Sequence, residues 1–140
     1  MNRPLDFGDL KADPNLLKRA LNGSCVNGPT IEAWEDARSF ITEAIHRSGT
    51  ILDIGCANGF LLRSLQEWSN HTLEPFGMDA SRSRSRDTAA FFPDKSRHFA
   101  NLPIEQFSDL SWSLPDSYDF LYWNVWDDYL FDTPDRADLL

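Results

Sequence analysis

A glycine loop at residues 53–59 is the feature of the sequence that points most directly to chemistry. It reads Asp53-Ile54-Gly55-Cys56-Ala57-Asn58-Gly59 and follows a short apolar run. Gly55 and Gly59 allow the backbone to turn tightly and to approach a ligand closely, and the start of the following helix presents unpaired N–H donors. Asp53 precedes the first glycine, where a carboxylate suits an ammonium group better than a phosphate.

The loop does not complete the pattern of a dinucleotide site. That pattern is G-x-G-x-x-G, whereas here Ala57 occupies the middle position and no third glycine follows. An NAD-dependent enzyme or a nucleotide-sugar enzyme, which would have a similar order of strand, glycine loop and helix, is therefore an alternative that the sequence disfavours.

Three later polar residues stand at the ends of apolar segments. Asp79 follows Gly77-Met78, Asn101 follows Ala100, and Asn124 ends an aromatic run that begins at Tyr118. A carboxylate such as Asp79, about 20 residues beyond the glycine loop, can accept hydrogen bonds from both ribose hydroxyls of a nucleoside. An amide such as Asn101 can accept one from an exocyclic amine.

Together these segments resemble the class I S-adenosylmethionine-dependent methyltransferases. That family has an acidic residue and a G-x-G-x-G loop after the first strand, and Asp53, Gly55 and Gly59 match it, with Ala57 in place of the middle glycine. An acidic residue ends the family's second strand, a polar residue ends the third, and the fourth is a hydrophobic strand that leads to the transfer site. The resemblance implies S-adenosyl-L-methionine as cofactor, and it implies these cofactor-binding residues: Asp53, Gly55, Cys56, Ala57, Gly59, Asp79, Ala80, Asn101, Leu102 and Asn124.

Other reactive residue types are better explained as structural or solvated. Cys56 has no histidine near it in the sequence, so it is expected to be a packing residue rather than a nucleophile. The isolated His46, His71 and His98 match no metal spacing, and no metal site is predicted. The alternate arginines of the 82–86 segment do not share a helix face, so nucleic-acid binding is not expected. The acids of the segment 126–129 fit a solvated loop better than an acceptor or ion site.

The elements that must position these residues alternate between helix and strand. Helices are predicted over 13–21, from Thr30 to Gly49, after the glycine loop through Trp68, and over 81–92. Strands are predicted over 50–54, 73–78, where Pro75 weakens the signal, 98–100 and 118–125. This alternation predicts an α/β fold with a Rossmann-like, doubly wound and mainly parallel sheet, preceded by two N-terminal helices.

Composition limits the class of protein. The 140 residues contain 41% hydrophobic residues, which is enough for the core of one domain. A net charge of −9 disfavours non-specific binding to nucleic acid or to an anionic membrane. Two cysteines are too few for a disulfide framework, and neither a signal peptide nor a membrane span is recognisable. A cytoplasmic protein is therefore expected.

The resemblance covers about residues 30–132 and implies a sheet that is incomplete at its C-terminus. We expect an N-terminal helical segment at 1–49 and a partial S-adenosylmethionine-binding domain at 50–140, with a helix starting at Thr133-Pro134. Such domains usually have seven strands, so the fourth strand would be an unprotected edge through which the chain self-associates.

The predicted function is methyl transfer from S-adenosylmethionine to a small-molecule acceptor. No Asn-Pro-Pro-Tyr element follows the fourth strand, which disfavours a DNA base as acceptor, and the sequence identifies no catalytic side chain. The alternative is a cofactor-binding module or the inactive remnant of a methyltransferase.

Overall fold

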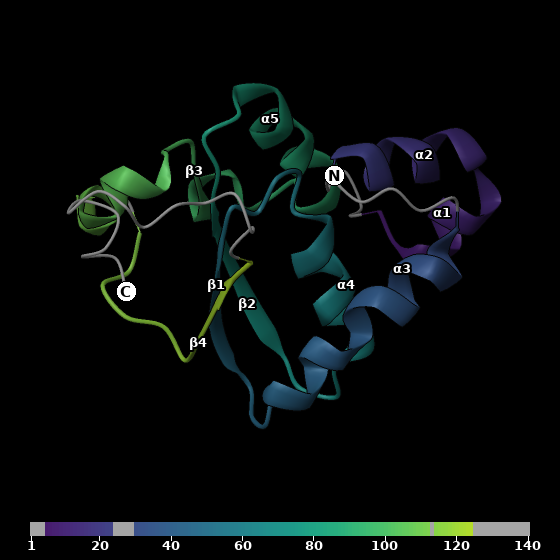
Figure 1. Cartoon of the computed structure of the whole chain (residues 1–140), viewed down its shortest axis with the longest axis horizontal. Coiled ribbons are helices and arrows are strands. Elements are labelled where there is room, and N and C mark those ends of the chain that lie inside the picture. The colour runs from purple at the N-terminus through teal and green to yellow at the C-terminus, as the bar shows by residue number, and fades with distance from the viewer. Residues whose placement is uncertain (1–4, 24–29, 113, 125–140) are drawn as a thin grey trace.

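A four-stranded parallel sheet lies at the centre of the chain (Figure 1). The computed structural model describes residues 5–23, 30–112 and 114–124, so the predictions for Val125, for segment 126–129 and for the helix at Thr133 lie outside the described residues. The strands are β1 (Gly49–Ile54), β2 (Leu73–Met78), β3 (Phe99–Ala100) and β4 (Phe120–Trp123), in the spatial order β3-β2-β1-β4.

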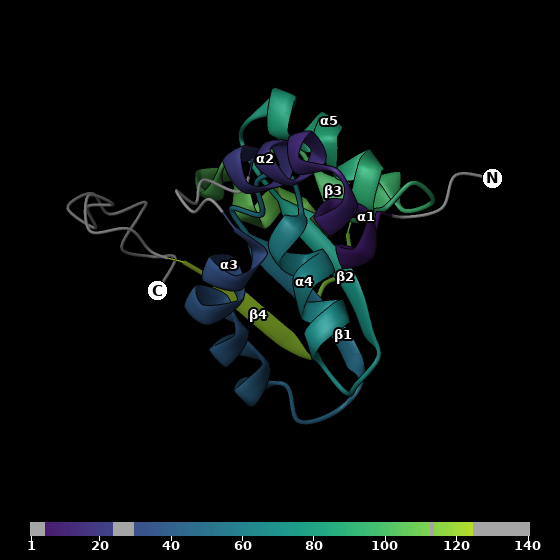
Figure 2. The same ribbon diagram turned by 90° about the vertical axis from the view of Figure 1, so that its right-hand side faces the viewer.

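Helical segments cover both faces of this sheet (Figures 1 and 2). The α-helices are α1 (Phe7–Ala12), α2 (Pro14–Gly23), α3 (Ile31–Arg38), α4 (Phe60–Trp68) and α5 (Arg82–Phe91). The 3-10 segments are η1 (Ser39–Ala44), η2 (Ser96–His98) and η3 (Ile104–Trp112). Helices α4 and α5 connect β1 to β2 and β2 to β3, and η3 lies on the connection back to β4. The prediction of a Rossmann-like, doubly wound α/β fold is confirmed.

Two hydrophobic clusters lie on opposite faces of β1, because alternate residues of a strand point to opposite sides. Ile51 belongs to the larger cluster, which contains buried residues of all five α-helices. Leu52 and Ile54 belong to the smaller cluster, against which residues of η3 pack. Asp53 alternates with Leu52 and Ile54, so its side chain is on the face that the α-helices cover.

The segment from Thr30 to Gly49 differs from the single helix predicted for it. Thr30 caps α3 as expected, since its Oγ1 accepts a hydrogen bond from the Ala33 N–H at 3.1 Å. The α-helix ends at Arg38, whose φ of −130° and ψ of −18° are not helical, and the chain continues as the 3-10 segment η1. The apolar spacing persists through this change, because Ile41 and Ile45 are still buried.

Strand β2 has the predicted bounds although Pro75 lies inside it. Pro75 is paired with Ile51 of β1, whereas β3 joins the other side of β2 only at Gly77 and Met78. A proline lacks a donor, and at this position no third strand requires one. The Pro75 carbonyl instead contacts the His98 ring at 2.9 Å.

Side-chain hydrogen bonds attach the N-terminal helices to the sheet domain. Asn58 Nδ2 donates to the Ala20 carbonyl of α2 at 3.0 Å, and Arg63 Nε of α4 donates to the Leu5 carbonyl at 3.0 Å. These bonds fix the glycine loop and α4 against the segment that precedes β1. Within the described residues, no helix is both long and apolar enough to span a bilayer.

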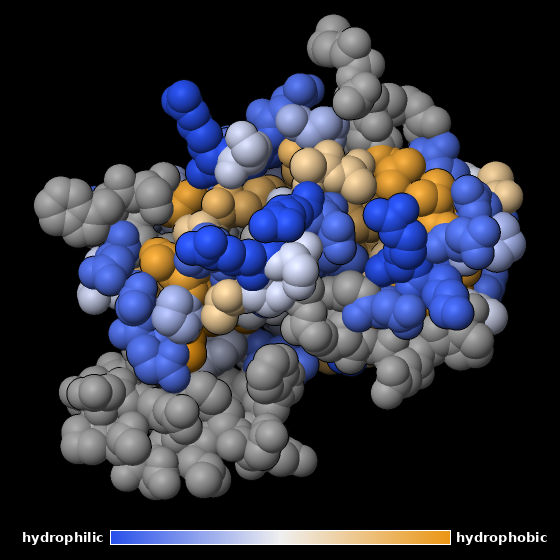
Figure 3. Space-filling model, turned by 90° about the horizontal axis from the view of Figure 1, so that it is seen from above, coloured by the Kyte–Doolittle hydropathy of each residue, from blue (hydrophilic) through white to orange (hydrophobic). Residues whose placement is uncertain are grey.

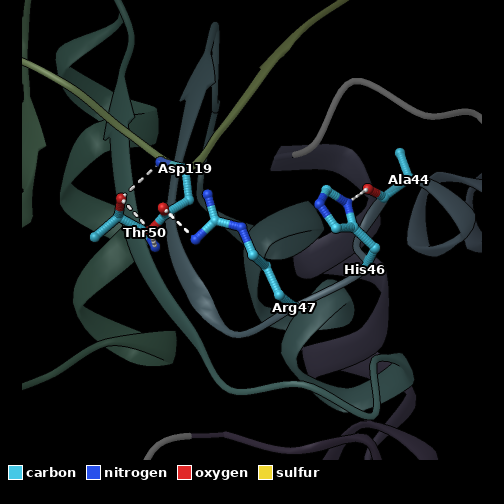
Figure 4. Close-up of polar contacts among 5 residues, drawn as sticks. All are labelled: Ala44, His46, Arg47, Thr50 and Asp119. Carbon is cyan, nitrogen blue, oxygen red and sulfur yellow. Dashed lines mark hydrogen bonds and ion pairs between the residues drawn. The ribbon is translucent and has the colours of Figure 1, made fainter.

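The start of β4 is attached to the start of β1 by one carboxylate, as Figure 4 shows. Asp119 Oδ2 accepts a hydrogen bond from the Thr50 N–H at 2.8 Å, and Asp119 Oδ1 forms an ion pair with Arg47 Nη1 at 2.7 Å. The Asp119 N–H in turn donates to Thr50 Oγ1 at 3.0 Å. Gly49 is required beside this group because a Cβ there would collide with the Asp119 side chain.

Candidate functional site

A pocket of about 350 Å³ opens where β1, β2 and β4 end, the end of the molecule seen in Figure 3. Polar side chains surround apolar atoms on this face. The strand order changes direction between β1 and β4, and ligands of doubly wound sheets bind at such a point. The pocket is lined by Trp34, Arg38, Asp53, Ile54, Gly55, Cys56, Ala57, Leu61, Met78, Asp79, Ala80, Ser81, Leu102, Pro103, Ile104, Glu105, Tyr122, Trp123 and Asn124.

The glycine loop has left-handed backbone angles at every second residue. The φ angles are 78° at Gly55, 52° at Ala57 and 81° at Gly59. Glycine adopts this conformation without the steric cost that a Cβ brings, which explains a preference for glycine at all three positions. Ala57 therefore has an unfavourable backbone conformation that a glycine would relieve.

The amide groups of Gly55, Cys56 and Ala57 in this loop are already hydrogen-bonded. The N–H groups of Gly55 and Cys56 both donate to the Met78 carbonyl, at 2.8 and 3.0 Å. The Ala57 N–H donates to Asp79 Oδ2 at 2.8 Å. A phosphate site needs several free N–H groups directed at one point. These three amides do not provide them.

Asp53 is a buried carboxylate that lines the pocket, and the part of the chain that the structure describes gives its side chain no partner. Its residue surface is 3% exposed, and no donor from the described residues forms a hydrogen bond or ion pair with its side chain. Burial raises the pKa of the Asp53 carboxyl well above its usual range, and the nearby Asp79 raises it further. A buried anion without a partner is costly, so this geometry favours a cationic group of a ligand.

Asp79 connects the end of β2 to the glycine loop. Its Oδ2 accepts from the Ala57 N–H and its Oδ1 from the Ser81 N–H, both at 2.8 Å. A carboxylate oxygen has two lone pairs, so each oxygen retains one acceptor position. Asp79 can therefore hold the loop and still accept hydrogen bonds from a pair of hydroxyls in the pocket.

Eight of the ten predicted cofactor-binding residues line this pocket, and two do not. Gly59 caps α4, where an added Cβ would lie 3.3 Å from a ring carbon of Phe92. Asn101 is exposed, and its Nδ2 donates to the backbone carbonyl of Asp79 at 2.8 Å. In this structure both residues support the site from outside the pocket.

Cys56 lines the pocket as a buried packing residue. Burial raises the pKa of the Cys56 thiol, and the carboxylates of Asp53 and Asp79 raise it further, so the thiolate is disfavoured. The thiol packs against Gly77, where an added Cβ would lie 2.6 Å from Sγ. This arrangement agrees with the packing role expected from the sequence.

Sequence reasoning missed the part of the pocket that comes from α3. Trp34 and Arg38 line the pocket from this helix, together with Tyr122 and Trp123 of β4. The available signal was the spacing of Trp34 and Arg38, which are four residues apart and therefore share one face of the helix. Within the described residues, no cluster of three or more His, Cys, Asp or Glu side chains could hold a metal ion.

Comparisons with known proteins give distant structural similarities. No protein-family model matches the chain, and no curated protein matches it. YjhP from E. coli is 16% identical, with a TM-score of 0.38 over 62% of this chain and 35% of that chain. The plantazolicin methyltransferase BamL, solved in complex with a triazolic desmethylPZN analog and SAH, is 18% identical, with a TM-score of 0.43 over 76% of this chain and 35% of that chain.

The chain thus spans about a third of the length of each of these solved structures. At such TM-scores the assignment of the fold depends on the chain's own topology. Four parallel strands in the order β3-β2-β1-β4, helical crossovers on both faces and a glycine loop after β1 are all present. The fold is therefore Rossmann-like.

Proposed function

We propose that the chain binds S-adenosylmethionine in this pocket and transfers its methyl group to a small-molecule acceptor. The observation that carries the proposal is the buried Asp53 carboxylate, which lines the pocket and has no hydrogen-bond donor among the described residues. The ammonium group of the cofactor would provide the missing partner. Asp79 would accept hydrogen bonds from the ribose hydroxyls through its remaining lone pairs.

The electrostatics of the loop argue against a dinucleotide in the same pocket. The Ala57 amide is bonded to Asp79, and Asp53 presents a second carboxylate beside it. A pyrophosphate would meet two negative charges at this position, where a dinucleotide site offers free amides.

The chain's own residues have few tasks in the proposed reaction. When bound, the cofactor supplies a sulfonium-activated methyl group, so the protein mainly has to align the acceptor and exclude water. Leu102 and Ile104 provide an apolar wall suited to the adenine base, and Tyr122 and Trp123 close the pocket on the β4 side. The acceptor would enter between these two walls.

Calorimetric titration with S-adenosylhomocysteine, and with NAD in parallel, tests the cofactor assignment. We expect S-adenosylhomocysteine to bind, NAD to bind much more weakly or not at all, and Asp53→Asn to weaken binding of S-adenosylhomocysteine by about 1 to 3 kcal/mol. Glu32→Gln is the matched control, because it removes the same charge from an exposed position outside the pocket. Preferential binding of NAD would refute the proposal.

An assay of methyl transfer to a panel of small acceptors, in which the released S-adenosylhomocysteine is measured, tests the activity itself. Methylation of any acceptor, at a rate that the Asp53→Asn substitution lowers, supports a methyltransferase. Tight binding of the cofactor with no turnover of any acceptor would instead favour the cofactor-binding module.

A further inference from the structure

Arg38 lines the pocket from α3, and the packing of Trp34 fixes α3 to α4. Trp34, one helical turn earlier, is 1% exposed, and its Nε1 donates to Ser64 Oγ at 2.8 Å. The Trp34 ring also stacks on Phe60 with the ring centroids 5.0 Å apart. The Arg38 guanidinium lies over the Trp34 ring, 5.8 Å from its centroid. A rigid support therefore holds the base of the Arg38 side chain.

Arg38 is the single positively charged side chain among the described residues that line the pocket. The same lining contains three carboxylates, those of Asp53, Asp79 and Glu105. The Arg38 Nη1 donates to the Ala37 carbonyl at 3.3 Å, and no carboxylate of the described residues forms an ion pair with this guanidinium. A guanidinium has five donors in a fork that matches a carboxylate, so most of its binding capacity remains available.

Asp53 and Arg38 approach the pocket from the same side of the sheet. Asp53 of β1 is paired in register with Tyr122 of β4, and both side chains are on the face that α3 covers. Both charges act on the Tyr122 hydroxyl. Burial raises the pKa of Tyr122, the charge of Arg38 lowers it, and the charge of Asp53 raises it. The buried Asp53 carboxylate and the Arg38 guanidinium, which can still bind a ligand, thus both lie near Tyr122. An α-amino acid presents the complementary pair of charges, an ammonium and a carboxylate.

We propose that Arg38 binds the α-carboxylate of the cofactor's amino-acid portion while Asp53 binds its ammonium group. This inference rests on the proposed function, since it assigns a second residue to the same ligand. It also gives the segment before β1 a direct part in the site, because α3 provides the group that recognises the carboxylate.

Two ligands that differ by one carboxylate provide the test. S-adenosylhomocysteine carries both charged groups, and its decarboxylated analogue S-adenosyl-3-thiopropylamine keeps only the amine. Isothermal titration of the wild-type chain should show the analogue binding about 10- to 100-fold more weakly, the usual effect of losing a charge-assisted pair. Arg38→Met should weaken S-adenosylhomocysteine by a similar factor and leave the analogue unchanged. Arg97→Met removes an exposed arginine outside the pocket and should change neither affinity.

The outcomes separate this inference from the proposed function. The inference fails if the wild-type chain binds both ligands equally, or if Arg38→Met still prefers S-adenosylhomocysteine over the analogue. In either case Arg38 does not bind the carboxylate, and the proposed function is unaffected. If neither ligand binds the wild-type chain, the proposed function fails first. The wild-type comparison needs no variant, so a poorly folded Arg38→Met protein cannot obscure the result.

Discussion

The backbone at Ala57 is the clearest local strain among the residues of the site. Its φ of 52° is positive although the residue has a Cβ. We expect Ala57→Gly to raise the free energy of unfolding by about 1 kcal/mol, because glycine adopts this conformation at no steric cost. Urea denaturation would measure the change.

Gly59→Ala serves as the opposite case. Its φ is +81°, and the added Cβ would lie 3.3 Å from the Phe92 ring, so this variant should be less stable than the wild type. A destabilised Ala57→Gly protein would contradict the account of loop strain.

Asp53 should lower the free energy of unfolding of the ligand-free chain, although it contributes to ligand binding. Its pKa is raised in the folded state by burial and then by Asp79, so the folded chain binds more protons than the unfolded chain between about pH 4 and the raised pKa. Stability is therefore lost as the pH rises through this window, and the full cost is present above it. We expect Asp53→Asn to raise the free energy of unfolding at neutral pH by about 1 to 3 kcal/mol.

Thermal unfolding of the ligand-free proteins across this pH range checks the expectation. The two proteins should converge as the pH falls below about 4, because the aspartate is then protonated in both the folded and the unfolded chain. A variant that is less stable than the wild type at neutral pH would show that Asp53 has a structural partner.

At the scale of elements, the attachment of β4 to β1 depends on Asp119. The hydrogen bond from the Thr50 backbone lowers the pKa of Asp119, and the bond and charge of Arg47 lower it further. Because its pKa is lowered in the folded chain, the ionised Asp119 carboxylate stabilises the fold at pH values above the ordinary carboxyl range. This stabilisation is lost as the pH falls through the folded-state pKa. We expect Asp119→Ala to speed hydrogen exchange at the Thr50 amide.

Asp116→Ala is the control for this exchange experiment, because Asp116 is exposed and lies three residues before Asp119. Unchanged protection of the Thr50 amide in Asp119→Ala would mean that the strand ladder alone holds β4 in place.

The strands and the glycine loop were predictable because their signals are local. The apolar run before Asp53 and the glycines after it stand next to each other in the sequence, as do Met78 and Asp79. The contribution of α3 was not predictable, because nothing in the sequence places Arg38 at the pocket until the packing of Trp34 is known. The six residues of α1 are too few for a periodic pattern to show. The paired amides of the loop depend on the Met78 carbonyl and Asp79, which reach the loop only through the pairing of β1 with β2.

At the scale of the whole molecule, β4 is an edge of the described sheet. Its described partner is β1, and Leu121 on this strand is 55% exposed. A strand with one edge open and with exposed apolar side chains favours association with another copy of the chain. We expect the wild-type protein to self-associate in sedimentation experiments and Leu121→Lys to reduce its average mass.

Phe40→Lys is the matched control, because Phe40 is the other large apolar side chain described as well exposed, at 61%, and it belongs to η1 rather than to β4. A wild-type monomer, or association that only Phe40→Lys abolishes, would place no interface at β4.

The pairing of β4 with β1 also sets an order of assembly. The bond between Thr50 and Asp119 joins residues 69 positions apart, so this strand docks only after a long loop has closed. A ribosome-bound chain that has exposed β1, β2 and β3 already has the glycine loop and Asp79, but it lacks the wall that Tyr122 and Trp123 provide. Asp53 would then face water, where its charge costs little. Ligand recognition in the nascent chain should therefore appear late, when the fourth strand buries that carboxylate.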